Sequence, residues 1–247
     1  MSDQILGVIP ARYASTRLPG KPLALIGTKP MIQWTYHHAS LSKSIHRLVV
    51  ATDDKRIHDI VLGFGGESVL TSPDHPTGTD RIMEVAETYP NYGIIVNIQG
   101  DEPGMEANLI DGVVGLKTKY RNWEMTTAAV PFTSAEDPKD PNKVKVVFDN
   151  QGRANYFSRS PIPASFKADA KYFRHLGIYA YERDFLMNYN QLPASDWETV
   201  ESLEQLRALQ NGSTIGVYLS DKANLGVDSP ADLEVVIAEF KRKGLIE

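Results

Sequence analysis

The sequence predicts an α/β fold with a Rossmann-like, mostly parallel sheet and helices on both of its faces. Short apolar runs alternate with longer amphipathic segments in the first half of the chain, beginning with Ile5–Ile9 and Pro30–Leu41. Strands that alternate with helices in this way form parallel sheets whose two faces are covered. The chain has 247 residues, of which 42% are hydrophobic, so it is long enough to bury a large core without disulfides.

The apolar runs of the first half have the length of single strands, and the amphipathic segments between them have the length of helices. After Ile5–Ile9, which Pro10 is expected to end, the predicted strands are Leu48–Thr52, Glu67–Leu70, Ile94–Ile98 and Met125–Val130. After Pro30–Leu41, the predicted helices are Lys55–Gly63, 79–88 and Glu106–Lys117. Ligands of such sheets bind beyond the carboxyl ends of the strands. The polar loops that follow Ile9 and Ile98 are therefore placed where chemistry is expected.

The second half is less regular and carries the signal of a β-hairpin. Val144–Phe148 and Ala154–Ser158 flank the turn-forming segment Asp149–Gly152, and Phe173–Tyr181 is a further β-prone run. An apolar stripe predicts one helix through Trp197, Val200, Leu203, Leu206 and Leu209. We expect a single domain over 1–247, with a hairpin-bearing insertion at 131–220.

The last helix is marked at both ends. Ser229 is the expected N-cap, Pro230 occupies the first helical position, and Asp232 can reach back to the cap. Basic residues at 241–243 fill the last turn, and Gly244 follows as a stop signal.

Composition excludes several classes of function. Cysteine is absent, which removes disulfides, thiolate nucleophiles and cysteine-ligated metal sites. The start of the chain has no basic region before its apolar stretch, and no run of about 18 apolar residues occurs. A cytoplasmic protein without membrane insertion is expected. The net charge of −5 disfavours a nonspecific nucleic-acid binder.

The charge is spread unevenly, and this draws attention to the loop after the first strand. Residues 1–30 carry +3 and the remaining 217 carry −8. Arg12, Arg17 and Lys21 lie within ten residues of one another, and such cations can converge on phosphate oxygens. The loop lacks the glycines and the Ser or Thr of a P-loop or a dinucleotide fingerprint. A solvated basic loop is the alternative interpretation.

Two further polar segments are candidates for a site. Asp101 follows the strand Ile94–Ile98 and suits Mg²⁺, which accepts one or two carboxylates and completes its shell with phosphate and water. A turn-forming role before Pro103 is the alternative. The segment 71–81 is rich in turn residues, and Thr79 there is a possible helix cap.

The string from Ala11 to Lys21 resembles the N-terminal signature of nucleotidyltransferases that make CMP-activated acidic sugars, Ala-Arg-x-x-Ser-x-Arg-x-Pro-Gly-Lys. Gly226–Leu233 is similar to the Gly-Val-Asp-x-Pro-x-Asp-Leu segment near the C-terminus of that family. Tyr156–Arg159, Arg174–Tyr179 and Leu203–Arg207 resemble sugar-side segments of the 3-deoxy-manno-octulosonate (Kdo) cytidylyltransferase, or CMP-Kdo synthetase, family. These matches run in the family's order from residue 7 to about 235.

The resemblance implies a nucleotide-diphospho-sugar transferase type of fold and a set of site residues. Catalysis would depend on Arg12, Lys21, Asp101 and Asp228, of which Asp101 and Asp228 would hold Mg²⁺. The nucleotide-binding residues would be Pro10, Ala11, Arg12, Arg17, Lys21, Thr77, Gly78, Thr79, Arg81 and Gln99. The sugar-binding residues would be Arg159, His175, Tyr179, Glu204 and Gln205. Glu201, Glu204 and Gln205 are expected on one helical face. Without the resemblance, His175 would be interpreted as a histidine packed within a strand.

The implied reaction converts CTP and Kdo to CMP-Kdo and pyrophosphate for lipopolysaccharide synthesis. The implied assembly is a homodimer, with 131–220 as the sugar-binding and dimerisation region and with Tyr181, Phe185 and Trp197 as contact or core aromatics. Three alternatives stay open: a sibling enzyme acting on 8-amino-Kdo or another acidic sugar, a nicotinamide-dependent oxidoreductase, which the absent glycine fingerprint disfavours, and a non-catalytic CTP-binding regulator.

Overall fold

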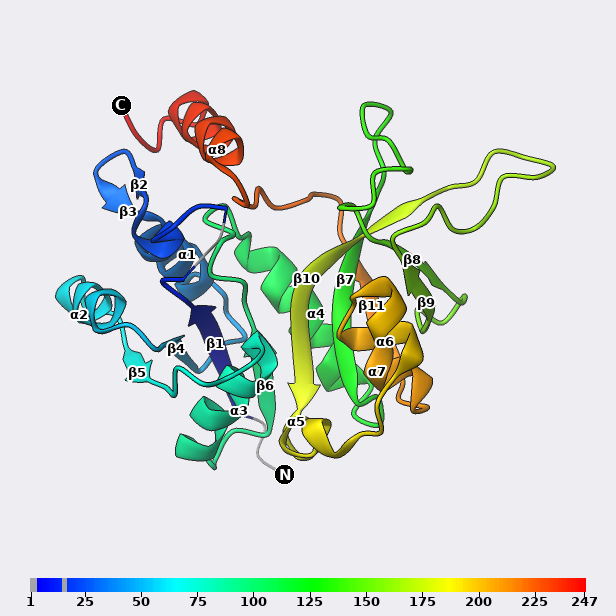
Figure 1. Ribbon diagram of the computed structural model, residues 1–247, viewed down its shortest axis with the longest axis horizontal. Coiled ribbons are helices and arrows are strands. Elements are labelled where there is room, and N and C mark those ends of the chain that lie inside the picture. Colours follow the sequence, from blue (N-terminus) through cyan, green and yellow to red (C-terminus); the bar gives the residue numbers. More distant parts are fainter. Residues whose placement is uncertain (1–3, 15–16) are drawn as a thin grey trace. The chain divides into compact units, whose positions relative to one another are not determined.

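The computed structural model describes residues 4–14 and 17–247, and the chain divides into two units (Figure 1). The first unit consists of Met1–Asp111 together with Asn224–Glu247, and the second is the continuous stretch Gly112–Ala223. The expected insertion, 131–220, falls inside the second unit. Its role in sugar binding or dimerisation stays a prediction.

Four parallel strands form the sheet of the first unit, in the order β6-β1-β4-β5. They are β1 (Ile5–Ala11), β4 (Arg47–Thr52), β5 (Ser68–Leu70) and β6 (Ile94–Asn97). Leu6, Val8 and Ile9 of β1 are completely buried, as expected for a central parallel strand covered on both faces. The predicted strands are confirmed to within one or two residues at their ends.

The first strand differs from its prediction because it passes through Pro10 and ends at Ala11. Proline lacks the N–H that a ladder requires. The carbonyl of Val8 accepts from Ile98 N on the β6 side, and residues two apart in a strand point to the same side. The nitrogen of Pro10 therefore faces the side on which β6 has already ended, while pairing with β4 continues to Ala11. No ladder hydrogen bond is lost.

The helices of the first unit follow the predicted ranges closely. They are α1 (Met31–Ser40), α2 (Lys55–Gly63), α3 (Gly78–Thr88) and α8 (Pro230–Arg242), with α4 (Ala107–Lys119) running across the boundary into the second unit. A short η1 (Lys21–Leu23) and the small strands β2 (Leu25–Ile26) and β3 (Lys29–Pro30) precede α1. The side chains of α1 and α8 share a cluster that contains Trp34, Val236 and Phe240.

The ends of α8 are as predicted. Ser229 Oγ accepts from Asp232 N, and the Asp232 carboxylate accepts from Ser229 N, which together form a capping box. Pro230 is the first helical residue. Gly244 follows the C-cap with φ 68°, a left-handed conformation that favours glycine.

The second unit contains antiparallel and parallel pairs. The long strand β10 (Phe173–Glu182) is antiparallel to β7 (Met125–Pro131), and β11 (Ile215–Leu219) is parallel to β7. The predicted hairpin is confirmed as β8 (Lys145–Phe148) and β9 (Ala154–Ser158). In its turn, Gly152 adopts φ 84°, which glycine permits without strain.

The single helix predicted from Trp197 to Leu209 is wrong. The structure has two short helices, α6 (Asp196–Glu201) and α7 (Gln205–Gln210), which follow α5 (Arg183–Met187) and η2 (Tyr189–Gln191). Ser202 lies between α6 and α7 with φ 52°, and this left-handed residue stops the helix. Glu201, Glu204 and Gln205 consequently do not share a helical face. Within the described residues, no helix has both the length and the apolar character needed to span a membrane.

Candidate active site

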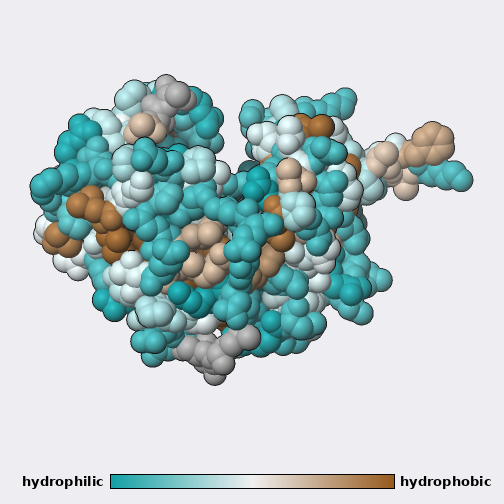
Figure 2. Space-filling model, turned by 60° about the horizontal axis from the view of Figure 1, so that its bottom comes forward, coloured by the Kyte–Doolittle hydropathy of each residue, from teal (hydrophilic) through white to brown (hydrophobic). Residues whose placement is uncertain are grey.

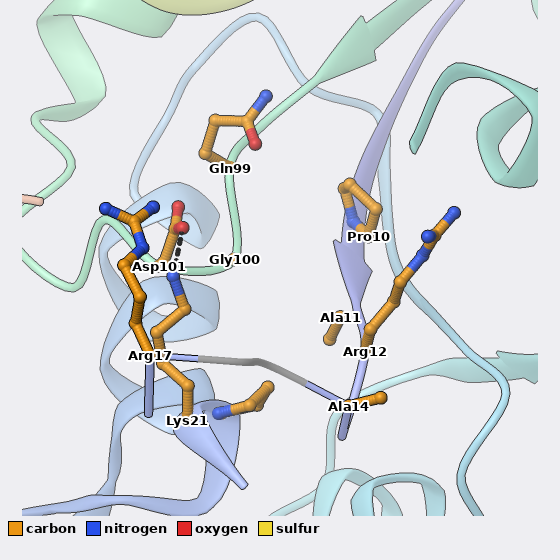
Figure 3. Close-up of a pocket in the computed structure, with 10 residues that line it drawn as sticks. Pro10, Ala11, Arg12, Ala14, Arg17, Lys21, Gln99, Gly100 and Asp101 are labelled. Atoms are coloured by element: carbon orange, nitrogen blue, oxygen red, sulfur yellow. Dashed lines mark hydrogen bonds and ion pairs between the residues drawn. The ribbon is translucent and has the colours of Figure 1, made fainter. Parts of the chain in front are cut away.

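A cavity of about 340 Å³ opens at the carboxyl end of β1 in the first unit. Its walls come from the loop after β1 and the loop after β6, which are the two loops singled out by the sequence. The lining residues are Pro10, Ala11, Arg12, Ala14, Arg17, Lys21, Pro22, Gln99, Gly100 and Asp101. Figure 3 shows Arg12 on one side of the cavity and Lys21 beside Asp101 on the other.

Lys21 joins the two carboxylates that were predicted to hold a metal ion. Its Nζ lies 2.6 Å from Asp101 Oδ2 and 3.5 Å from Asp228 Oδ1, and it also donates to the carbonyl of Val227 at 3.0 Å. Arg17 contacts the same Asp228 oxygen at 2.9 Å. The Lys21 side chain is only 15% exposed, so the ammonium lies inside the cavity wall. Residues from three distant parts of the sequence therefore meet at one cation.

The backbone explains why these groups meet. Val227 N donates to the carbonyl of Asp101 at 2.9 Å, which ties the segment before α8 to the loop after β6. On the other side, Gly20 N donates to the carbonyl of Tyr13 at 3.1 Å, and Gly20 adopts φ 68°. This closed loop leads directly into η1, whose first residue is Lys21.

Gly100 allows a close approach between the two loops of the cavity. A Cβ atom added to Gly100 would lie 2.6 Å from the carbonyl oxygen of Pro10, which is too close for any side chain. On its other side, the Gly100 carbonyl accepts a hydrogen bond from the buried Thr35 hydroxyl at 3.1 Å. The loop that carries Asp101 is thus held by α1 and pressed against the end of β1.

Arg12 reaches across to the segment before α3. It donates to the carbonyl of His75 at 2.8 Å and to that of Pro76 at 3.4 Å. His75 is itself paired with Glu84 of α3. Burial raises the pKa of Glu84, but hydrogen bonds from His75 and from Ser72 N outweigh this and lower it overall. The structure therefore brings the turn-rich segment 71–81, which carries predicted nucleotide-binding residues, next to Arg12.

Most of the predicted nucleotide-binding residues in the segment 71–81 have a structural role within the fold. Thr77 is the N-cap of α3 and forms a capping box with Asp80, Gly78 is the first helical residue, and Thr79 is buried. Thr77 and not Thr79 is therefore the cap. The guanidinium of Arg81 is fully buried, contacts Thr71 and donates to Asp53 at 2.9 Å. Burial lowers the pKa of Arg81. Contacts of these residues with a nucleotide stay predictions.

The remaining nucleotide-site predictions lie around the cavity. Pro10, Ala11 and Gln99 line it together with Arg17. Ser15 belongs to the quoted signature but lies outside the described residues.

The predicted sugar-binding residues all belong to the second unit. The guanidinium of Arg159 donates hydrogen bonds to three backbone carbonyls. They are the carbonyl of Glu201, which Nε contacts at 2.7 Å, that of Pro141, which Nη1 contacts at 2.9 Å, and that of Ser202, which Nη2 contacts at 3.2 Å. The Glu201 carboxylate accepts from Arg159 N at 2.8 Å and from a serine hydroxyl of β9. Arg159 and Glu201 therefore join the end of β9 to the end of α6.

His175 and Tyr179 stand on β10 with their rings 5.5 Å apart. His175 hydrogen-bonds to Thr127 Oγ1 at 3.0 Å and packs edge-on against Phe157. Burial lowers the pKa of His175 to about 3. Burial, together with the charge of Glu204 and the neighbouring Tyr189, raises the pKa of Tyr179 well above its usual value. Both rings are neutral near pH 7, as the packed-strand interpretation of His175 expects.

This lowered pKa makes a prediction about stability. Because the unfolded chain binds a proton at His175 below pH 6.5 and the folded chain does not, this contribution to stability is present above pH 6.5 and is lost as the pH falls. Between pH 8 and pH 5 the loss amounts to about 2 kcal/mol. The measurement is the free energy of unfolding in urea for the wild type and His175→Gln at pH 8 and pH 5. The decrease between these two pH values should be smaller in the variant by about 2 kcal/mol. Equal losses in both proteins would contradict the assignment.

Glu204 and Gln205 lie at the start of α7. The carbonyl of Glu204 accepts from the Tyr189 hydroxyl at 2.8 Å. Gln205 is 4% exposed, and its Nε2 has no hydrogen-bond partner in the structure. A buried amide donor without a partner is costly. A role of Glu204 or Gln205 in sugar binding stays a prediction.

The comparisons with known proteins identify the family of the chain. A family model described as cytidylyltransferase matches residues 6–215 of the chain. The chain belongs to the cytidylyltransferase family. The 3-deoxy-manno-octulosonate cytidylyltransferase of Leptospira biflexa serovar Patoc is 94% identical over 246 residues, with 100% of both chains covered. The enzyme of the same name from Leptospira interrogans serogroup Icterohaemorrhagiae is 60% identical over 243 residues, with 98% of both chains covered.

A solved structure supports the same family and fold. It is CMP:2-keto-3-deoxy-manno-octonic acid synthetase complexed with CTP, which is 42% identical to this cytidylyltransferase with a TM-score of 0.93. The match covers 97% of this chain and 99% of the other. The predicted α/β nucleotidyltransferase fold and the predicted family are thereby confirmed.

The donor set in this cytidylyltransferase suits Mg²⁺. Within residues 4–14 and 17–247, no three His, Cys, Asp or Glu side chains are arranged to hold a metal ion by themselves. Asp101 and Asp228 nevertheless converge on one cation, the Lys21 ammonium. Magnesium is typically bound by one or two carboxylates together with substrate phosphates, so two carboxylates beside a phosphate-sized cavity fit this ion.

Sequence reasoning missed several residues that shape the site. Gly100 and Pro22 line the cavity, Asp53 neutralises Arg81, and Asn224 anchors the segment before Asp228. The pair Gly100-Asp101 after a buried strand was a usable signal for a close backbone approach. Asp53 and Asn224 gave no signal, because only the fold brings them to their partners.

Proposed function

We propose that the protein transfers CMP from CTP to the anomeric hydroxyl of Kdo, releasing pyrophosphate. The observation that carries the proposal is the meeting of Lys21, Asp101 and Asp228 at a cavity in a chain 94% identical to a Kdo cytidylyltransferase. The CTP complex of the 42% identical structural neighbour supports the choice of nucleotide.

The chemistry needs positioning and charge neutralisation more than a covalent participant. The sugar hydroxyl oxygen forms a bond to the α-phosphorus, the bond from that phosphorus to the bridging oxygen breaks, and pyrophosphate leaves with its electron pair. The hydroxyl proton passes to water or to the departing pyrophosphate. Arg12 and Lys21 stand on opposite walls of the cavity, so they can hold the triphosphate between them and offset the charge that develops on it.

We propose Mg²⁺ as the metal, held by Asp101 and Asp228 together with phosphate oxygens. When bound, it supplies Lewis-acid polarisation of the α-phosphate and lowers the pKa of a coordinated hydroxyl. For the two carboxylates to bind it, Lys21 has to release them, and the triphosphate offers the ammonium a new partner. The chain thus exchanges one set of ion pairs for another as the nucleotide enters.

The test is pyrophosphate release by the purified protein with a panel of nucleotides and acidic sugars, with and without Mg²⁺. We expect release with CTP, Kdo and Mg²⁺ together and background rates with ATP, GTP or UTP. A preference for 8-amino-Kdo or a sialic acid would show that the substrate is that acidic sugar and not Kdo. CTP binding without pyrophosphate release from any sugar would show a regulator in place of an enzyme.

We further propose that the protein is a homodimer in the cytoplasm, with contacts made by the second unit. Of its predicted contact aromatics, Tyr181 is buried, whereas Trp197 is partly exposed. The loop between β9 and β10 projects from this unit (Figure 1), and Figure 2 shows hydrophobic surface at its end. Phe166 of that loop is 91% exposed. Sedimentation velocity of the wild type and Phe166→Ser tests this: a monomeric wild type would overturn it.

A further inference from the structure

Asn224 links two segments that lie far apart in the sequence, the loop 101–106 after β6 and the segment 224–228 before α8. Its Nδ2 donates to Glu102 Oε2 at 2.9 Å and to Met105 Sδ at 3.0 Å. Its Oδ1 accepts from Glu106 N at 3.2 Å. Both polar atoms of the amide are therefore used on the same loop, which fixes the orientation of the side chain.

A second anchor lies three residues further along. Val227 N donates to the carbonyl of Asp101 at 2.9 Å. Between the two anchors the segment follows the loop closely, because a Cβ atom added to Gly104 would lie 3.7 Å from Leu225 Cβ. The segment 224–227 is thus fastened at both ends to the loop that carries Asp101.

Asp228 depends on this fastening for its position. Its side chain is 58% exposed and contacts Arg17 and Lys21, two long side chains that are themselves adaptable. The separation between the Asp101 and Asp228 carboxylates is therefore set mainly by the backbone on either side of them. Asn224 and Val227 connect that backbone to the loop of Asp101. On the other side, Asp228 N donates to Asp232 Oδ2 of the α8 capping box at 3.0 Å.

We propose that Asn224 is a positioning residue for the metal-binding pair, holding Asp228 at the distance from Asp101 that a divalent cation needs. The inference rests on the proposed function, because it takes these two aspartates as the Mg²⁺ ligands. Asn224 does not line the nucleotide cavity and does not contact the carboxylates of Asp101 or Asp228. It acts through Val227 and Asp228. Its chemistry is specific: an aspartate at this position would keep the acceptor for Glu106 N but would place a second carboxylate against Glu102.

The test measures how much Mg²⁺ strengthens CTP binding. Titration calorimetry of the full-length protein with CTP, with and without Mg²⁺, gives this enhancement as a ratio of affinities. We expect Asn224→Ala to reduce the enhancement about 10-fold, equivalent to about 1.4 kcal/mol, and Asn224→Asp to reduce it at least as much. The affinity for CTP without metal should stay within about two-fold, because Lys21 keeps its partner Asp101 and Arg12 keeps the carbonyls of His75 and Pro76.

Two controls separate positioning from general damage. Asn142→Ala changes an exposed asparagine whose hydrogen bond to Asp140 comes from its backbone nitrogen, and it should leave the enhancement unchanged. Glu102→Gln keeps an acceptor for Asn224 and should retain most of the enhancement, whereas Glu102→Ala should lose it. The double variant Asn224→Ala/Glu102→Ala should be no worse than Asn224→Ala alone, because that single change already removes the link to Glu102.

The outcomes distinguish the inference from its premise. In the activity assay, Asn224→Ala should need about 10-fold more Mg²⁺ for half-maximal pyrophosphate release while kcat at saturating Mg²⁺ stays within about two-fold. An undiminished enhancement in Asn224→Ala would overturn the positioning role alone. If Mg²⁺ did not strengthen CTP binding to the wild type, the premise that Asp101 and Asp228 bind Mg²⁺ would be wrong.

Discussion

Replacement of Asp101 by asparagine is expected to lower kcat at least ~100-fold, the scale of losing one key electrostatic group in an active site. The amide keeps the size of the side chain but removes the negative charge that faces Lys21 at 2.6 Å. A neutral amide oxygen is also a weaker ligand for Mg²⁺ than a carboxylate. The backbone carbonyl of residue 101 still accepts from Val227 N, so the loop should keep its course.

The measurement is steady-state pyrophosphate release at saturating CTP, Kdo and Mg²⁺, with circular dichroism to confirm folding. Asp59→Asn is a matched control, since Asp59 forms an exposed ion pair with Lys55 on α2, and such pairs contribute little. We expect this control to turn over at the wild-type rate. Near-native turnover by Asp101→Asn would refute the assignment of this carboxylate to the metal.

Replacement of Lys21 by methionine is expected to lower kcat/KM for CTP on the order of 100-fold. Methionine fills the space of the aliphatic chain but cannot neutralise the phosphates. A lysine in a solvated loop would have little effect on folding, but the Lys21 side chain is mostly buried and paired with Asp101. We accordingly expect the free energy of unfolding to fall by about 1–2 kcal/mol as well.

Calorimetric binding of CTP and urea unfolding separate the two effects. Lys55→Met, on the exposed face of α2, is the control for loss of one positive charge and should change neither quantity appreciably. If Lys21→Met bound and used CTP like the wild type while losing stability, Lys21 would be a structural residue only.

Much of the first unit could be predicted because its signals are local. Short, mainly apolar runs such as Ile94–Ile98 between turn residues favour buried strands. The Ser229-Pro230-Ala231-Asp232 start of α8 satisfies its own backbone groups. The break between α6 and α7 could not be predicted in this way. The stripe from Trp197 to Leu209 has a helical period, but the left-handed Ser202 divides it, and Arg159 donates to the carbonyls exposed at this break.

The site was predictable as a set of residues but not as a set of contacts. Three cations after one strand and an aspartate after another indicated a phosphate site, because the carboxyl ends of parallel strands meet at one edge. The burial of Arg81 against Asp53 was not predictable, since an arginine in a turn-rich segment normally suggests exposure. Likewise, no spacing rule relates Asn224 to Glu102, which it meets only because the chain returns to the first unit.

The ammonium of Lys21 between two aspartates has a further consequence for the order of events on the enzyme. A divalent ion that arrives alone competes with a cation that is covalently part of the chain and therefore never diffuses away. A triphosphate changes this competition, because it attracts the ammonium and brings additional oxygen ligands at the same time. If Asp101 and Asp228 hold Mg²⁺ as proposed, Lys21 would be their counter-ion until the ligands bind, and nucleotide and metal would favour each other's binding.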